Sequence, residues 1–295
     1  MNPGVAYALA AFTIWGLYPL YFRLLEGVPA IEVVLQRSVW SLVFVLGVLA
    51  VLRRWQWLAP LLRESRRLAV YAASALLIAG NWLVYVHAVQ THQVLQASLG
   101  YFINPLVSVA LGVLVLRERL RRLQWLAVVL ASAGVAWLTW RNGGLPWIAL
   151  ALAVLFGVYG LLRKTAPLGA LEGLAAETLL LAPLALAGLA WATAARPEPL
   201  LEARPTLLVW LALSGPLTAL PLYCYTQAAR RLPLATVGVL QYLSPTLQFA
   251  LGVWVFGETF DAARLAGFAL IWAALACYSA DALIGSRPRP EPPPA

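Results

Sequence analysis

The sequence predicts an all-α integral membrane protein with ten transmembrane helices, built as two inverted five-helix repeats, with both termini in the cytoplasm. Three observations support this fold class: the composition, a series of apolar runs, and a match between the two halves of the chain. Of the 295 residues, 62% are hydrophobic and 11% are charged, whereas about 25% of an ordinary soluble domain is charged. So few charges cannot cover a water-facing surface, which argues against a soluble enzyme and against a nucleic-acid-binding protein.

Ten apolar runs account for the helices, since a transmembrane helix needs about 20 residues. Arg, Pro or Gly residues bound each run, as is typical of helix ends. The predicted helices cover 4–23, 30–52, 68–88, 94–116, 123–140, 146–163, 170–194, 206–228, 234–256 and 263–283. An even number of spans places both termini on the same side of the membrane.

The basic residues orient these helices, because cytoplasmic loops of membrane proteins are enriched in Lys and Arg. With a cytoplasmic N-terminus, the cytoplasmic side carries fifteen basic residues: Arg53, Arg54, Arg63, Arg66, Arg67, Arg117, Arg119, Arg121, Arg122, Arg163, Lys164, Arg230, Arg231, Arg287 and Arg289. The opposite side carries five, and Arg37 lies inside a predicted helix. Orientation thus explains most of the net charge of +9, and the inner (cytoplasmic) membrane is the expected location.

The two halves of the chain match when one is shifted by about 140 residues. Glu118 then falls on Glu258, and Pro105 falls on Pro245. Because each half contains an odd number of helices, the second half enters the membrane from the opposite side. This is the inverted-topology repeat of many secondary transporters.

The repeat divides the chain into three parts. Residues 1–141 form the first five-helix repeat, and residues 142–283 form the second, inverted one. Residues 284–295 are too rich in proline to pack, so we expect a disordered cytoplasmic tail.

Two ionisable residues lie inside predicted helices, where charge is costly and faces the bundle interior. Arg37 and Glu177 coincide under the repeat offset, which predicts that they meet across the two halves. Such a pair could act in gating or proton coupling, or it could be a static pair that fixes helix register. The sequence leaves both interpretations open.

Polar and aromatic side chains recur at matching positions in both halves, in stripes along single helix faces. With Arg37, the predicted substrate-binding residues are Trp15, Tyr18, Asn81, Tyr85, Tyr101, Asn104, Ser108, Tyr225, Gln241, Ser244 and Gln248. We expect them to line a central cavity. The alternative is that they only bond neighbouring helices to one another.

The sequence contains no recognisable catalytic or phosphate-binding motif, so no enzyme activity is predicted. His87 and His92 are five residues apart and do not share a helix face, which argues against a metal site. We therefore expect no cofactor and no metal.

Several motifs resemble the RarD family of EamA-type transporters, within the drug/metabolite transporter superfamily. They are Asn81-Trp-Leu-Val-Tyr85, Leu99-Gly-Tyr-Phe-Ile-Asn-Pro-Leu-Val-Ser108, Glu118-Arg-Leu and Leu123-Gln-Trp125. The resemblance implies ten helices, cytoplasmic termini, export, and a cavity lined largely by helices 1, 3, 4, 6, 8 and 9. Gln96 stands where many members carry Glu, so a proton-linked role there does not carry over.

The functional expectation is a secondary active transporter that exports small organic metabolites or drugs by alternating access. Its expected partners are a small-molecule substrate, the lipid bilayer, and a proton or a counter-solute for coupling. The alternatives are an uncoupled facilitator or channel-like permease, an intramembrane enzyme, and a non-transporting membrane scaffold.

Overall fold

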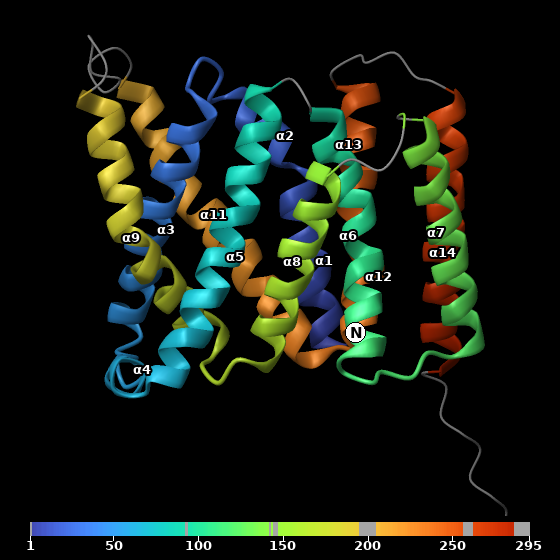
Figure 1. Cartoon of the computed structure of the whole chain (residues 1–295), viewed down its shortest axis with the longest axis horizontal. Coiled ribbons are helices and arrows are strands. Elements are labelled where there is room, and N and C mark those ends of the chain that lie inside the picture. The colour runs from blue at the N-terminus through green and yellow to red at the C-terminus, as the bar shows by residue number, and fades with distance from the viewer. Residues whose placement is uncertain are drawn as a thin grey trace, which may run out of the picture.

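The computed structural model describes residues 2–91, 94–141, 143, 147–194, 205–255 and 262–285, and its regular elements there are all helices (Figure 1). The helices are α1 (Pro3–Gly16), α2 (Tyr18–Arg23), α3 (Ala30–Val51), α4 (Leu58–Arg63), α5 (Ser65–Gln90), α6 (Val94–Leu114), α7 (Arg122–Arg141), α8 (Trp147–Thr165), α9 (Ala170–Ala194), α11 (Pro205–Arg231), α12 (Leu234–Leu240), α13 (Leu243–Trp254) and α14 (Ala262–Gly285). Within the described residues, seven helical segments are long and apolar enough to cross a membrane, and Leu99–Leu114 and Leu265–Asp281 are shorter apolar helices. The chain is thus a multi-pass membrane protein. The predicted tail covers 284–295: residues 284–285 instead end α14, and residues 286–295 lie outside the described residues.

Each of the ten predicted helices coincides with helical residues, but two of them are broken. The predicted helix 4–23 is divided into α1 and α2, and the predicted helix 234–256 is divided into α12 and α13. Proline explains the first break: Pro19 has no N–H to donate to the carbonyl of Trp15, four residues earlier. A side chain takes over this role, because Gln248 Nε2 donates to the Trp15 oxygen at 3.1 Å.

The second break lies beside the first in space. Pro245 follows it and cannot donate to the carbonyl of Gln241, which instead accepts from the N–H of Ser244 at 3.1 Å. Ser244 Oγ in turn donates to the carbonyl of Phe12 in α1 at 2.7 Å. Both breaks therefore sit where α1 packs against α13.

The bundle is elongated, with helix pairs at its two ends (Figure 1). At one end α7 packs along α14, and a side chain at Gly134 would fall 2.8 Å from the carbonyl oxygen of Gly267, so these backbones approach closely. At the other end α9 packs on α3. Helices α1, α5, α6, α8 and α11 to α13 fill the space between them.

The N-terminus, α4, the connection between α6 and α7, and the C-terminal end of α14 lie on one side of the bundle (Figure 1). We call this side the basic edge, because it holds the arginines of segments 53–67 and 117–122. Helix α2 lies near the opposite side (Figure 1).

Candidate functional site

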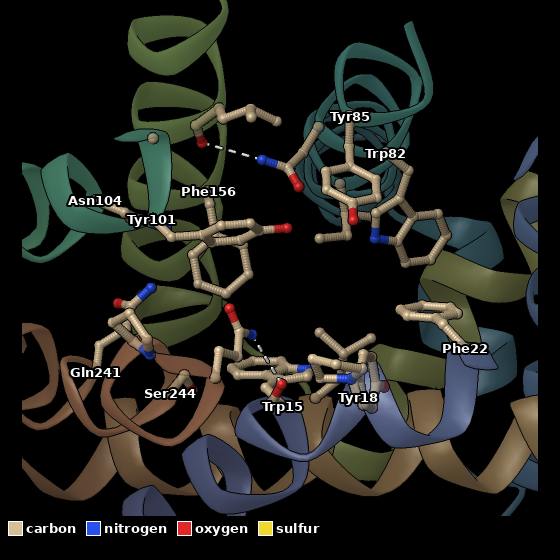
Figure 2. Close-up of a pocket in the computed structure, with 18 of the residues that line it drawn as sticks. Trp15, Tyr18, Phe22, Trp82, Tyr85, Tyr101, Asn104, Phe156, Gln241 and Ser244 are labelled. Atoms are coloured by element: carbon tan, nitrogen blue, oxygen red, sulfur yellow. Dashed lines mark hydrogen bonds between the residues drawn. The ribbon is translucent and has the colours of Figure 1, made fainter. Parts of the chain in front are cut away.

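A cavity of about 180 Å³ lies in the middle of the bundle, between the broken helices and α3, α5, α6, α8 and α11 (Figure 2). Ten predicted substrate-binding residues line it: Trp15, Tyr18, Arg37, Asn81, Tyr85, Tyr101, Asn104, Gln241, Ser244 and Gln248. Both halves of the chain contribute to this lining. The fold thus brings together residues that lie more than 200 positions apart in the sequence.

Two other predicted residues lie outside the cavity. Ser108 is 1% exposed and faces Gly238, where the missing side chain lets α12 approach α6. Tyr225 is fully buried, and its ring packs against those of Trp15 and Phe156, with centroids 5.7 and 5.1 Å apart. Tyr225 therefore supports the cavity wall from behind.

The sequence interpretation missed the apolar and aromatic part of the lining, notably Phe22, Trp82 and Phe156. These side chains close the cavity between the polar residues (Figure 2). Nothing in the sequence separates them from aromatic residues that face lipid, because both kinds stand in apolar runs.

Several of the polar lining residues bond the helices to one another. Asn81 Nδ2 donates to the carbonyl of Leu152 at 3.0 Å, which joins α5 to α8. Ser244 and Gln248 donate to carbonyls of α1, as described above. For these donors the interhelical interpretation is correct, although the same side chains also line the cavity.

Two buried amides are different. Asn104 is 3% exposed and Gln241 is 6% exposed, and within the described part of the chain Asn104 Oδ1 and Gln241 Oε1 have no hydrogen-bond partner. An unpartnered buried oxygen of this kind costs about 1–3 kcal/mol. Both residues line the cavity, but the two oxygens themselves are buried, so each amide must rotate before its oxygen can accept from a bound molecule.

Arg37 is the charged residue of the cavity: no other charged side chain is found among the described lining residues. Its Nε donates to Thr218 Oγ1 at 3.1 Å, and its guanidinium carbon lies 4.8 Å from the centre of the Trp82 ring. No carboxylate of the described residues forms an ion pair with it. The cavity therefore presents a positive charge that no described carboxylate balances.

The predicted pair of Arg37 with Glu177 is wrong. Glu177 is 1% exposed, and its Oε1 lies 3.3 Å from Nη1 of Arg163. Ser74 Oγ also donates to Glu177, and Tyr159 donates to it at 3.3 Å. Arg163 itself donates to Thr226 Oγ1 at 3.2 Å.

Depth explains why Arg37 and Glu177 do not meet. Each lies about two turns into its helix, or about 10 Å from the helix start. However, α3 begins on the side opposite the basic edge, whereas α9 begins at the basic edge (Figure 1). Two residues equally far into helices that begin on opposite sides lie at different depths, so Arg37 and Glu177 do not meet.

Arg163 is the residue that the sequence interpretation misplaced, because it was counted as a cytoplasmic loop residue. It is 1% exposed and lies within α8. Its guanidinium occupies the space that a side chain at Gly173 would fill. A glycine one turn before a buried glutamate was therefore the available signal for an arginine partner.

The Arg163–Glu177 pair lies behind a group of aromatic rings that we call the aromatic layer: Phe12, Trp15, Phe156, Tyr159 and Tyr225. Trp15 and Phe156 line the cavity, and Tyr159 contacts Glu177. The rings are continuous, since Tyr159 stacks on Tyr225 with centroids 6.3 Å apart. The aromatic layer thus separates the cavity from the ion pair.

Closer to the basic edge, Glu118 joins three segments of the chain. Its carboxylate accepts the backbone N–H groups of Leu234 at 2.6 Å and Ala235 at 3.0 Å, at the start of α12. Lys164 Nζ lies 3.8 Å from the same carboxylate and donates to the carbonyl of Ala229 at 2.9 Å. The ends of α8, α11 and α12 are therefore fastened together at this side.

Within the described part of the chain, no group of three His, Cys, Asp or Glu side chains could hold a metal ion. The side chains of His92 and Gln96 lie outside that part.

Comparison with known proteins gives concordant results. The sequence model of the EamA-like transporter family matches residues 2–140 and again 144–280. An uncharacterized transporter of Pseudomonas aeruginosa is 51% identical over 99% of this chain and 98% of its own length. Protein RarD of Escherichia coli K12 is 44% identical over 96% of each chain. One crystal structure superposes with a TM-score of 0.72 at 20% identity, covering 96% of this chain and 99% of the other, which shows a shared fold.

Proposed function

Since this chain belongs to the EamA-like transporter family, we propose that it is a secondary active transporter that exports small organic metabolites or drugs across the inner membrane. The family and its relatives make the chain a membrane transporter rather than an enzyme. The observation that carries the finer proposal is the cavity, which both halves line with polar and aromatic groups. A small solute held there would pass from one side to the other as the halves rock.

The two halves act as inverted repeats in this proposal. Two findings support it: the family model matches each half once, and the helix contacts come in exchanged pairs. The contact of α1 with α11 corresponds to that of α8 with α5, and the contact of α1 with α13 corresponds to that of α8 with α6. This pattern is expected if a pseudo-twofold axis relates residues 1–141 to residues 142–283.

The basic edge faces the cytoplasm in this proposal, and both termini lie there. The arginines of segments 53–67 and 117–122 support the orientation. Because Arg163 lies in the bundle and not in a loop, the number of basic residues on the cytoplasmic side falls by one. That side still carries more basic residues than the opposite side.

The conformation corresponds to a carrier closed toward the cytoplasm. The aromatic layer, the Arg163–Glu177 pair and the Glu118 contacts lie in turn between the cavity and the basic edge. On the other side, the cavity reaches Pro19 and Phe22 of α2. Opening to the cytoplasm requires these inner contacts to part, which gives Glu177 a gating role with Arg163 instead of Arg37.

Flux through purified protein in liposomes tests the proposal. Solutes that raise the melting temperature of the purified protein would be radiolabelled, and their uptake measured with and without the same solute on the far side. A carrier gives saturable uptake that the opposing solute accelerates. Uptake that neither saturates nor responds would indicate a facilitator or a channel-like permease, and no uptake of any solute would contradict transport.

A matched pair of variants ties the flux to the cavity. Ile78 lines the cavity and is 3% exposed, whereas Leu76, on the same helix, is 64% exposed. Ile78→Trp fills the cavity and is expected to abolish uptake, while Leu76→Trp is expected to retain it. Equal loss in both variants would place the transport path elsewhere.

A further inference from the structure

We propose that the cavity selects a small organic monoanion that carries an N–H or O–H donor at the end remote from its anionic group, and that the membrane potential favours its export. This inference rests on the proposed transport function and specifies its substrate class and its energy source. Three features of the cavity carry it: a cation without a counter-charge, two unpartnered amide oxygens, and a lining without an acid.

The cationic end of the cavity is built for an anionic group. Arg37 uses Nε to hold Thr218, and its guanidinium lies over the face of Trp82. No described carboxylate pairs with it, although a bare charge inside a membrane protein is costly. A carboxylate or a similar group on the solute would supply the counter-charge and could accept two parallel N–H bonds from the guanidinium.

The opposite end of the cavity is built for a donor. Asn104, Gln241 and Ser244 gather on one side, and Phe22 and Trp82 lie on the other (Figure 2). Because Arg37 lies over Trp82, the amide oxygens and the guanidinium lie toward opposite ends. The two oxygens are buried in this conformation, and a rotation of each amide would turn its oxygen toward a solute N–H or O–H at this end.

The space between the two ends suits a flat, apolar body. Trp15, Tyr101 and Phe156 stand around it as ring faces and edges (Figure 2). With a volume of about 180 Å³, the cavity holds a molecule the size of a substituted benzoate and not a large drug. Aromatic rings of this kind pack well in offset or edge-to-face contact with aromatic side chains.

The energy source follows from the charges. Among the described lining residues there is no Asp, Glu or His that could carry a proton across with the solute. Glu177 lies behind the aromatic layer and is paired with Arg163. Arg37 is part of the protein and returns to its starting position at the end of each transport cycle. The net charge moved across the membrane in one cycle is therefore the single negative charge of the solute.

An interior-negative membrane pushes such a charge outward. One charge crossing 100 mV gains about 2.3 kcal/mol, which corresponds to a concentration ratio of about 50-fold. The membrane potential therefore contributes directly to the export of a monoanion.

The test uses four closely similar solutes in proteoliposomes. The first is 4-hydroxybenzoate, which is anionic and carries a donor. The others are 4-hydroxybenzamide, which is neutral; 4-methoxybenzoate, which lacks the donor; and 4-hydroxybenzamidine, which is cationic. We expect 4-hydroxybenzoate to be transported at least about tenfold faster than the amide and the amidine, since a hydrogen bond to a charged group contributes about 1.5–3 kcal/mol. It should be transported about two- to tenfold faster than 4-methoxybenzoate, which loses only a hydrogen bond between neutral groups.

The driving force is tested by setting the potential with potassium and valinomycin at equal pH on both sides. Vesicles with a negative interior should expel 4-hydroxybenzoate toward a ratio of about 50-fold at 100 mV. Vesicles with a positive interior should retain it. A final ratio that is indifferent to the sign of the potential, or that follows an imposed pH gradient at zero potential, would overturn the inference.

Variants connect each preference to its residue. Arg37→Gln should abolish the preference for the anion over the amide, and Arg37→Lys should retain part of it. Gln241→Leu should abolish the preference for the hydroxyl over the methoxy group and leave the charge preference intact. Arg66→Gln, which alters an exposed arginine at the start of α5, is the matched control and should change neither.

Binding gives a second readout that does not need transport. Trp15 and Trp82 line the cavity, so quenching of tryptophan fluorescence by 4-hydroxybenzoate reports occupancy in detergent. Saturable counterflow of neutral or cationic solutes, without anions, would refute the substrate class while the transporter proposal stands. Absence of flux for every solute, in protein that elutes as a folded species, would refute the transporter proposal itself.

Discussion

The buried pair of Arg163 and Glu177 is expected to be strongly coupled, and a double-mutant cycle measures this. The charged atoms are 3.3 Å apart, and the two side chains are 1% and 2% exposed. With an effective dielectric constant of about 20, their attraction is about 5 kcal/mol. Arg163→Gln leaves the Glu177 carboxylate buried without a counter-charge, which typically costs about 3–5 kcal/mol. The double variant Arg163→Gln/Glu177→Gln should recover most of that loss.

Chemical denaturation in detergent micelles gives the free energy of unfolding of each of the four proteins in this cycle. The coupling energy of the pair is the loss in the double variant minus the sum of the losses in the two single variants. An exposed pair provides the control: Arg67 Nε lies 2.5 Å from Glu64 Oε2, but the side chains are 35% and 50% exposed. Its coupling should remain below about 1 kcal/mol despite the shorter distance. Additive losses within about 0.5 kcal/mol at Arg163 and Glu177 would refute the reasoning that burial makes this pair strong.

Three further changes have defined outcomes, each measured as a change in the free energy of unfolding. Gly215→Ala places a methyl group against the backbone carbonyl of Trp40, where α11 crosses α3, and should destabilise the protein by about 1–3 kcal/mol. The control is Gly47→Ala, whose methyl group meets nothing within 4 Å and which should be neutral or stabilising. If Gly47→Ala destabilised more than Gly215→Ala, the account of this crossing would be wrong. Glu118→Ala removes the acceptor for two backbone N–H groups of α12 and should cost about 0.5–2 kcal/mol, whereas an unchanged value would show that the contact is dispensable. Gln248→Leu leaves the carbonyl at the break between α1 and α2 without its donor and should cost about 1–3 kcal/mol; a smaller loss would mean that another group replaces it.

The helices were predictable from the sequence because lipid imposes a simple requirement on them. A run of about 20 apolar residues is readable without knowing its neighbours. Helix breaks are not readable in this way. Pro19 and Pro245 accompany breaks, yet α6 contains Pro105 and continues through it. A carbonyl freed by proline needs another donor. At Pro19 this donor is Gln248, from a distant segment, whereas at Pro245 it is the nearby N–H of Ser244.

The polar part of the cavity was predictable for a related reason. Polar side chains in apolar helices are costly in contact with lipid and therefore face the bundle interior. Asn81, Asn104 and Gln241 are predictable as interior residues for this reason. The sequence did not show which partner each would take. The offset that aligned Arg37 with Glu177 compared their positions along each helix but not their depth in the bundle. A position judged to be a loop end, Arg163, supplied the true partner of Glu177.

The hydrogen bond from Gln248 to the carbonyl of Trp15 also sets an order of events during synthesis. The two residues are 233 positions apart, and ribosomes add roughly 5–20 residues per second. For roughly 10–50 s after α1 is made, its carbonyl at the break lacks this donor. Until α13 is synthesised, the break between α1 and α2 therefore lacks this hydrogen bond. Insertion of the first span and completion of the cavity are separate steps, and a ribosome that stops before residue 248 releases a chain in which the cavity cannot form.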